Sequence, residues 1–425
     1  MESCNTESSL DLPLESLSLQ SFLQSLHKEQ WQEVRLGDIT SIIGDGLHGT
    51  PNFDVNGECF FINGNNLNDG QIIIKKDTKK VSSIECAKYK KDINEKTILI
   101  SINGTLGNMA LYRGENIMLG KSACYLNFKD NVSRNFMRYV IINNDFQRYL
   151  NISATGTTIL NVSLKAIRDF TFLLPPLTIQ QKIAEILSSF DDKIDLLHRQ
   201  NKTLESLALT LFRHYFIDNP KRDEWEEKPL SEIAEIQNGY AFKNSDYTER
   251  GMETYEVLKM GHIESGGGLR YFPKAHYVKI NDKMTKWVLN EDDIVLAMTD
   301  MKDSLGILGY PAMVDKSNYY VLNQRVARIY LKSKDDFLHN YFLFLYLSLQ
   351  ENIQKLQSLA NGGVQVNLST EAIKNFTITI PPLEFQSQNN QAFINIIKKY
   401  KNNRKQIQNL QAMRDIILKA IFGAK

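Results

Sequence analysis

The segment Asn161–Gln180 reads NVSLKAIRDFTFLLPPLTIQ, and the segment Asn367–Gln386 reads NLSTEAIKNFTITIPPLEFQ. Both begin with Asn-x-Ser, continue through Phe-Thr and end with Pro-Pro-Leu-x-x-Gln, and the spacing between them is a constant 206 residues. Self-similarity that keeps its order along a chain indicates repeated structural units. This pair of segments therefore predicts that the protein is built from two homologous modules.

Weaker matches extend the duplication toward the N-terminus. Trp31–Ile39 corresponds to Trp225–Ile233 at a spacing of 194 residues, and Asn94–Ile98 corresponds to Asn290–Ile294 at 196. The matches stay in order while the spacing grows to 206, which chance similarity would not do. The second module is thus a copy of the first with small insertions.

Each module combines strand-like and helix-like patterns. Short β-branched and aromatic runs between Asn, Asp and Gly turn signals predict strands, for example at Gln71–Ile74, Ile98–Ser101 and Thr171–Leu174. Apolar residues at helical spacing predict helices over Phe136–Leu150 and Phe337–Leu356. We expect each module to be a mixed α+β globule.

A long amphipathic helix is predicted after each Pro-Pro pair, because proline is tolerated in the first turn of a helix. Apolar residues then alternate at spacings of four and three over roughly 37 residues, about 55 Å of helix. Asp191, Asp192 and Lys193 fall outside this stripe and are expected on a solvated face. The first stripe consists of Ile183, Leu187, Phe190, Ile194, Leu197, Asn201, Leu204, Ala208, Leu211 and Tyr215.

The two helices are predicted to pair antiparallel, since each follows its own copy of the module. In full overlap, the numbers of facing residues add up to about 604, which places Asn201 opposite Asn403. A polar residue at a core heptad position sets register at a cost in stability, and two amides can satisfy each other. Asn201 and Asn403 are therefore candidate register residues of a coiled coil.

The predicted fold class is α+β, with two homologous domains separated by two long antiparallel coiled-coil helices in a pseudo-twofold arrangement. The predicted boundaries are an N-terminal extension over 1–30, a first domain over 31–178, a long helix over 179–218, a second domain over 219–384, and a C-terminal long helix over 385–425. No role is assigned to the extension.

Composition limits the possible function classes. The 425 residues include 50 Lys and Arg against 49 Asp and Glu, a net charge of +1, so nucleic-acid binding would depend on local basic patches. Four scattered cysteines without CxxC spacing favour a reduced, cytoplasmic compartment. No signal peptide or membrane span is expected, because the longest apolar stretch is too short to cross a bilayer.

Catalytic motifs were sought without success. Gly120-Lys121-Ser122 ends like a phosphate-binding loop, but Glu115 occupies the place of the first glycine. The seven histidines show no HExxH or other metal-ligand spacing. Leu174 and Ile380 precede the Pro-Pro pairs, where amino-methyltransferases carry Asn or Asp. The sequence thus predicts a non-catalytic protein without a metal site or a cofactor of its own.

Candidate DNA contacts are polar and basic residues in loop-like segments, since base edges are read by donors and acceptors and phosphates by Lys and Arg. For any single residue, a turn or a solvating role is the simpler interpretation. The candidates in the first module are His48, Thr50, Asn65, Asn66, Lys75, Lys76, Lys79 and Lys80. Those in the second module are Asn238, Tyr240, Lys243, Lys259, His262, Arg270 and Tyr271.

The duplicated layout of a variable module, Asn-x-Ser, Pro-Pro-Leu, Gln and a long helix resembles the specificity subunits of type I restriction-modification systems. The resemblance covers nearly the whole chain from Trp31 onward. It implies that the modules are target-recognition domains, each reading one half of a bipartite, asymmetric site in double-stranded DNA. It implies also that the helices set the spacer between the half-sites.

The same resemblance implies partner subunits that carry out the chemistry. Two modification subunits would dock on the helices and methylate adenine with S-adenosylmethionine. Restriction subunits with ATP- and Mg-dependent translocase and nuclease activity would join them. The alternative is a coiled-coil adaptor whose modules bind protein, which would show no sequence preference in a DNA titration. An enzyme acting on nucleotides or sugars is a further alternative, but it would need an acid-base constellation.

Overall fold

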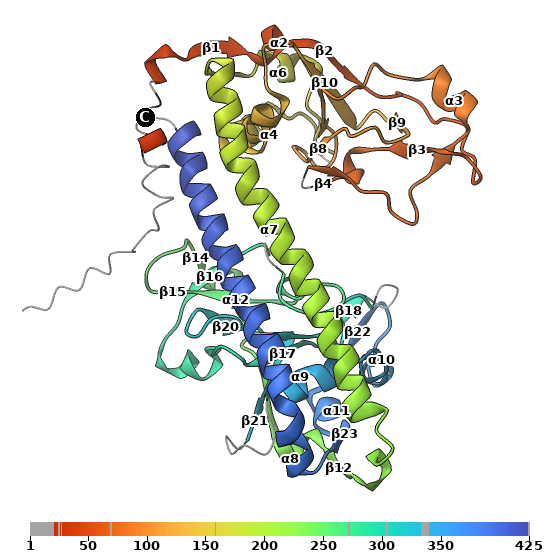
Figure 1. The fold of residues 1–425 in the computed structure, drawn as a ribbon, viewed down its shortest axis with the longest axis vertical. Helices are drawn as coiled ribbons and strands as arrows, with labels where there is room; N and C mark the ends of the chain where they lie inside the picture. The colour runs from red at the N-terminus through yellow and green to blue at the C-terminus, as the bar shows by residue number, and fades with distance from the viewer. Residues whose placement is uncertain are drawn as a thin grey trace, which may run out of the picture. The chain divides into compact units, whose positions relative to one another are not determined.

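The computed structural model describes residues 21–23, 26, 28–68, 70–157, 159–270, 273–301, 305–332 and 340–423, except for the side chain of Ser387. The chain forms two compact units, one of Met1–Ile194 with Gln408–Lys425 and the other of Asp195–Ile407. Each unit contains one α+β domain and part of both long helices (Figure 1). Most of the predicted N-terminal extension lies outside the described residues.

The first unit carries the elements of the first domain, with strands at the three places where the sequence predicts them. They are β1 (Gln32–Arg35), α2 (Leu36–Ile39), β2 (Thr40–Asp45), β3 (Cys59–Ile62), the 3-10 turn η2 (Gly64–Asn66), β4 (Leu67–Asn68), β5 (Gln71–Ile72), β6 (Lys80–Val81), α3 (Ser83–Lys88), β7 (Thr97–Ser101), β8 (Met109–Leu111), β9 (Ile117–Leu119), β10 (Ala123–Phe128), α4 (Arg134–Ile142), α5 (Asn144–Ser153), α6 (Leu164–Asp169) and β11 (Thr171–Leu174).

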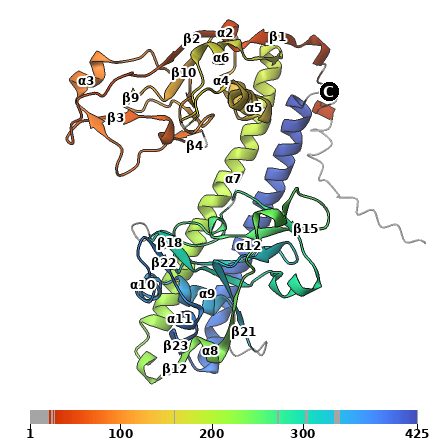
Figure 2. The same ribbon diagram turned by 180° about the vertical axis from the view of Figure 1, so that it is seen from behind.

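The second unit repeats this order with insertions. Its elements are β12 (Glu226–Pro229), α8 (Leu230–Ile233), β13 (Ala234–Asn238), η5 (Asn244–Asp246), β14 (Tyr247–Thr248), β15 (Thr254–Leu258), η6 (Met260–His262), β16 (Tyr277–Lys279), η7 (Asp282–Trp287), β17 (Ile294–Ala297), β18 (Thr299–Met301), β19 (Pro311–Met313), β20 (Tyr320–Leu322), β21 (Val326–Leu331), α9 (Asn340–Ser348), α10 (Gln350–Ser358), β22 (Gln365–Asn367), α11 (Thr370–Lys374) and β23 (Thr377–Ile380). Figure 2 shows this unit from behind.

The main sheets of the two domains have the same strand order. A four-stranded sheet has the order β2-β10-β7-β8 in the first domain and β13-β21-β17-β19 in the second. A second sheet, β6-β3-β9 in the first domain and β14-β16-β15-β20 in the second, contains the parallel pairs β3–β9 and β15–β20. A two-stranded ribbon pairs β1 with β11 and β12 with β23. The predicted duplication of an α+β module is thus confirmed at the level of strand order.

The residues of the repeated motif make equivalent hydrogen bonds in both copies. Ser163 and Ser369 accept the N–H of the residue three positions on and so cap α6 and α11. Gln180 and Gln386 are each 1% exposed, and each donates from its amide to the carbonyl of the first proline, at 2.9 and 2.8 Å. These local contacts explain why the motif occurs where a strand gives way to a long helix.

The long helices are α7 (Leu177–Phe212) and α12 (Leu383–Phe422), 36 and 40 residues in length. In the first unit the start of α7 contacts the end of α12 through Asp191 and Arg414, and in the second unit Phe212 packs on Phe393. The residue numbers of both pairs add up to 605, which matches the predicted antiparallel register.

Three sequence-based expectations about helices need correction. In place of one helix over Phe337–Leu356, the described residues form two, α9 and α10, with Leu349 between them. The helix predicted over Phe136–Leu150 is two helices, because Asn143 ends α4 and accepts the N–H of Asn144 to cap α5. Asp191 does not lie on a solvated face: its side chain is 13% exposed and bonds to Tyr139, Arg138 and Arg414. The heptad stripe alone did not reveal that α4 packs beside it.

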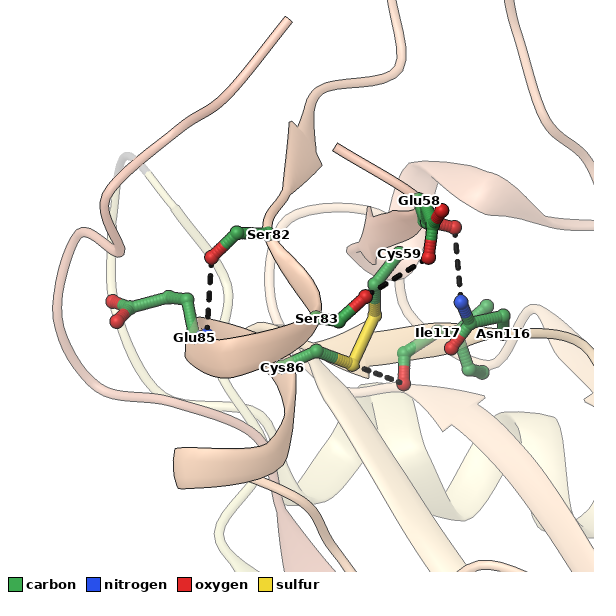
Figure 3. The surroundings of a disulfide bond; sticks show 8 residues. All are labelled: Glu58, Cys59, Ser82, Ser83, Glu85, Cys86, Asn116 and Ile117. Atoms are coloured by element: carbon green, nitrogen blue, oxygen red, sulfur yellow. Dashed lines mark hydrogen bonds between the residues drawn. A yellow bond between two sulfur atoms is a disulfide. The ribbon is translucent and has the colours of Figure 1, made fainter. Parts of the chain in front are cut away.

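A disulfide joins Cys59 at the start of β3 to Cys86 in α3, which are 27 residues apart (Figure 3). Around it, Ser82 caps α3 by accepting the N–H of Glu85, and Ser83 donates to Glu58 at 3.0 Å. The cysteine spacing did not predict this bond. It closes a chain segment that contains four candidate DNA-binding lysines.

Candidate nucleic-acid interface

The loop after β2 is positioned by a glycine that approaches the neighbouring backbone closely. A Cβ on Gly46 would lie 2.1 Å from the carbonyl oxygen of Leu119, and the next residue, Leu47, donates its N–H to that oxygen at 2.7 Å. The loop then exposes His48 and Thr50. The His48 Nε2 lies 2.6 Å from Asp45 Oδ2, so the carboxylate orients the imidazole at the surface.

A second loop follows β3 and lies beside the first. Gly64 donates its N–H to the Ser122 hydroxyl at 2.9 Å, and that hydroxyl donates to Asn63 Oδ1 at 2.9 Å. Asn65 is exposed at its tip. Asn66 is 5% exposed, accepts the N–H of Asn63 and donates to Ile73 and Thr78. Asn66 therefore shapes the loop, and its prediction as a surface contact residue is corrected.

A polar hollow of about 260 Å³ adjoins this loop. Its walls include Phe53, Phe61 and Asn65, and Lys75 and Lys79 lie at its edge. The Lys79 ammonium lies 4.4 Å from the Phe53 ring centroid, and Lys80 similarly covers the ring of Phe60 at 5.3 Å. Lys75, Lys76 and Lys79 are exposed and Lys80 is half-buried, so three of the four cations are available to an anionic ligand.

The second domain forms the corresponding loops with other side chains. A Cβ on Gly239 would lie 2.2 Å from the Asn323 carbonyl oxygen, so this glycine has the position of Gly46. Tyr240 packs between Phe242 and Trp287, with ring centroids 4.9 Å away on both sides. Asn238 is exposed but its Oδ1 accepts from the Thr370 hydroxyl at 2.7 Å, and Lys243 is exposed.

His262 occupies the position that Asn66 occupies in the first domain. Its Nδ1 accepts the N–H of Lys259 at 3.1 Å, and its Nε2 lies 2.9 Å from Glu256 Oε1, with the ring 2% exposed. The prediction of His262 as a contact residue is corrected for the same reason as that of Asn66. Lys259 is half-buried over the Tyr247 ring at 4.2 Å, and Arg270 is exposed near Glu264. Tyr271 lies outside the described residues.

The Glu256–His262 pair stabilises this loop. Burial raises the pKa of the Glu256 carboxyl, but hydrogen bonds from His262 and Tyr319 outweigh it and leave the pKa below its ordinary value of 4.5. Both side chains are less than 8% exposed. The pair therefore holds a buried carboxylate in its charged form beneath the loop surface.

The structure brings a third segment to these loops that the sequence analysis did not select. In the first domain Lys121 is exposed beside Ser122, between β9 and β10. In the second domain Gln324 and Arg325 are exposed at the corresponding place, and Gln324 donates its N–H to the Tyr240 carbonyl at 3.0 Å. Lys121 was considered only as part of a phosphate-binding motif. Its neighbour Ser122 bonds to Gly64, 58 residues away, so the approach of this segment to the loop after β3 is a tertiary feature.

Asn201 and Asn403 both lie in the helix pair and are 2% and 1% exposed. Asn403 donates from its amide to Gln200 Oε1 at 3.4 Å, next to Asn201. This contact agrees with the predicted register to within one residue. Direct bonding between the two asparagine amides stays a prediction.

Two kinds of feature are absent from the described ranges. These ranges contain no group of three or more His, Cys, Asp or Glu placed to hold a metal ion. Nor does any helix within them have the length and apolar character needed to cross a membrane.

Comparisons with known proteins agree with this architecture. The family model for the "Type I restriction modification DNA specificity domain" matches residues 28–206 and again 222–412. The type I restriction enzyme MjaVIII specificity subunit of Methanocaldococcus jannaschii is 26% identical over 93% of both chains. The MjaIX specificity subunit of the same organism is 24% identical over 77% of both.

A solved structure shares the fold. The crystal structure of the type I restriction-modification S subunit from M. genitalium superposes with a TM-score of 0.51 and 17% identity, over 93% of this chain and 96% of that one. Two family matches that cover most of the chain coincide with the two structural repeats. The chain therefore belongs to the family of type I restriction-modification DNA specificity proteins, with one specificity domain in each repeat.

Proposed function

We propose that this chain is the DNA-reading subunit of a type I restriction-modification complex and that each domain reads one half of a bipartite, asymmetric site. The observation that carries this proposal is a common loop framework with unlike polar side chains. Asn63 of the first domain corresponds to Lys259 of the second, and Lys121 corresponds to Gln324. Different donors and acceptors at equivalent positions suit the recognition of different base edges.

The exposed lysines of the first domain are proposed to bind phosphates. Lys75 and Lys79 line the hollow beside Asn65 together with Asp77, and Lys76 is exposed next to them. The net charge of the whole chain is only +1, so these lysines form a local basic patch. Phosphate contacts fix the register of a protein on the duplex, and base contacts then select the sequence. His48, Thr50 and Asn65 are the proposed base-reading side chains of this domain, and Asn238, Tyr240 and Lys243 are those of the second.

The helices α7 and α12 are proposed to set the spacer between the half-sites and to dock two modification subunits. In this proposal the modification subunits carry S-adenosylmethionine and methylate adenine, and restriction subunits use ATP and Mg²⁺. The chain itself contributes recognition and no catalytic group. The complex would act in the cytoplasm, where its DNA target lies.

The experiment is to map methylated adenines in cells that carry this chain with its modification partner. Substituting His48 with Ala should relax one half of the recognised sequence, and Lys243→Ala, the matched control in the second domain, should affect only the other half. Lys76→Ala removes a proposed phosphate contact and should weaken binding without changing the recognised sequence. Equal relaxation of both halves by His48→Ala would contradict the division between domains. Binding of purified protein to DNA without any sequence preference would favour the adaptor function instead.

A further inference from the structure

Asp191 is the centre of a polar cluster that joins three helices of the first unit. One carboxylate oxygen accepts from Arg414 of α12 at 2.9 Å, and the other accepts from the Tyr139 hydroxyl at 2.8 Å and lies 3.1 Å from Arg138. Burial disfavours the charge on Arg414, but its hydrogen bond to Asp191 outweighs this and raises the pKa of the guanidinium. The cluster is thus a charged contact between α7 and α12.

The repeat supplies a counterpart for each member of this cluster, 206 residues away, and every counterpart is apolar. Ile397 replaces Asp191 and Ala208 replaces Arg414, while Phe344 and Leu345 replace Arg138 and Tyr139. In the second unit these four apolar residues line a cavity of about 100 Å³. The contact between positions 191 and 414 is therefore ionic in the first unit, and its counterpart in the second unit, Ile397 with Ala208, is apolar. Glu205 and Tyr400 line the same cavity beside this apolar contact.

A second layer of the helix pair shows the same asymmetry. Asn201 and Asn403 are both buried, and Asn403 bonds to the residue beside Asn201. The repeat places Ile407 and Leu197 at their counterpart positions, and these two are 0% and 2% exposed. The layer of Asn201 and Asn403 is thus polar on both helices, and the layer of Leu197 and Ile407 is apolar on both helices.

These matches hold only when unlike repeats pair. If α7 paired with α7 of a second copy in the same register, Asp191 would face Ala208 and Asn201 would face Leu197. If α12 paired with its own copy, Arg414 would face Ile397. Each such contact would leave a buried polar group against an apolar one, which is costly because the group loses its water without gaining a partner.

We propose that these two layers make α7 selective for α12, so that every assembled molecule combines one recognition domain of each kind. The partner that this surface fits is the helix of the unlike repeat, and the partner that it rejects is a second copy of the same helix. The proposal concerns helix pairing alone and stands whether or not the domains bind DNA.

The test uses two full-length variants with different affinity tags. Asp191→Arg brings a third guanidinium beside Arg138 and Arg414, and Arg414→Asp brings a second carboxylate beside Asp191. Each variant alone should show a lowered Tm and a reduced soluble yield. When the two are expressed together, α7 of each chain can pair with α12 of the other, as in domain swapping, and both crossings then have opposite charges.

The expected result is a heterodimer that carries both tags, has twice the mass of one chain and has a Tm above that of either variant alone. Recovery of the Tm should be partial, because Arg138 stays beside the arginine at position 191. A single chain with both substitutions should show the same partial recovery of Tm as a monomer. Matched control variants, Leu196→Arg on α7 and Ile416→Asp on α12, change side chains that are 41% and 66% exposed and should stay monomeric when expressed together.

Two outcomes would overturn the proposal. One is that the co-expressed variants stay separate, each with its lowered Tm or poor yield, while the chain with both substitutions folds. The other is that the chain with both substitutions is as unstable as the single variants, which would mean that the charges act independently. Loss of sequence-specific DNA binding with normal heterodimer formation would count against the proposed function and leave the pairing intact.

Discussion

Replacing Gly46 with Ala tests whether backbone contact between two loops positions the reading surface of the first domain. The added Cβ would lie 2.1 Å from the Leu119 carbonyl oxygen and 2.2 Å from its carbon. Ordinary contacts between such atoms are about 3.5 Å, so the loop or the β9 end must move by more than about 1 Å. Both contacting atoms belong to the backbone, and a side-chain rotation cannot relieve the clash.

The expected loss of stability follows from two terms. Overpacking in a well-packed region costs about 1–3 kcal/mol, and loss of the Leu47-to-Leu119 hydrogen bond costs about 1 kcal/mol. In a domain of 150–250 residues each kcal/mol lowers Tm by about 2–4 °C. We therefore expect Gly46→Ala to lower Tm by roughly 5–15 °C, with the direct effect confined to the first unit.

The assay combines thermal unfolding with a competition between DNA duplexes mutated in one half-site or the other. Gly46→Ala should weaken discrimination at the first half-site only. Gly49→Ala, in the same loop, is the matched control because nothing lies within 4 Å of its added Cβ. Gly239→Ala should reproduce the effect at the other half-site, since its Cβ would lie 2.2 Å from the Asn323 carbonyl oxygen. If Gly46→Ala and Gly49→Ala gave the same Tm and the same discrimination, the reasoning from backbone contact would be refuted.

Three further predictions address the helices and the buried pair. Inserting seven residues into both helices, at matched points near Asn201 and Asn403, should lengthen each helix by about 10 Å. The spacer between the DNA half-sites should then grow by about three base pairs. An unchanged spacer in methylation maps of an active complex would show that the helices do not set it. Asn403→Leu should cost about 1–3 kcal/mol, and adding Asn201→Leu should recover much of it, whereas simple additivity in the double-mutant cycle would exclude coupling. Glu256→Gln should destabilise the protein at neutral pH. The folded pKa of Glu256 is lowered from 4.5, so the stability that its charged form adds is complete above about pH 4.5 and is lost as pH falls through the folded pKa. The difference in unfolding free energy between the unsubstituted protein and the variant should therefore shrink in acid. A difference that grew in acid would contradict the argument.

The architecture was predictable because its signals are local. Pro-Pro followed by a heptad stripe predicts a long helix from backbone and periodicity rules alone, and α7 and α12 begin at Leu177 and Leu383, directly after the prolines. The duplication required no structure, since the order of matches along the chain is itself the evidence. Two homologous domains and an antiparallel register followed from these features.

The role of individual polar residues was decided by tertiary structure. Asn66 and His262 look like surface polar residues in the sequence, yet both are buried because each folds back onto the backbone N–H three residues earlier and onto partners from other segments. Asp191 looks solvated on its helix but meets Arg138 and Arg414. Periodicity shows which face of a helix or strand is apolar. The partner of a polar group depends on which distant segments the fold brings within about 3 Å of it. A local sequence pattern does not specify that distance.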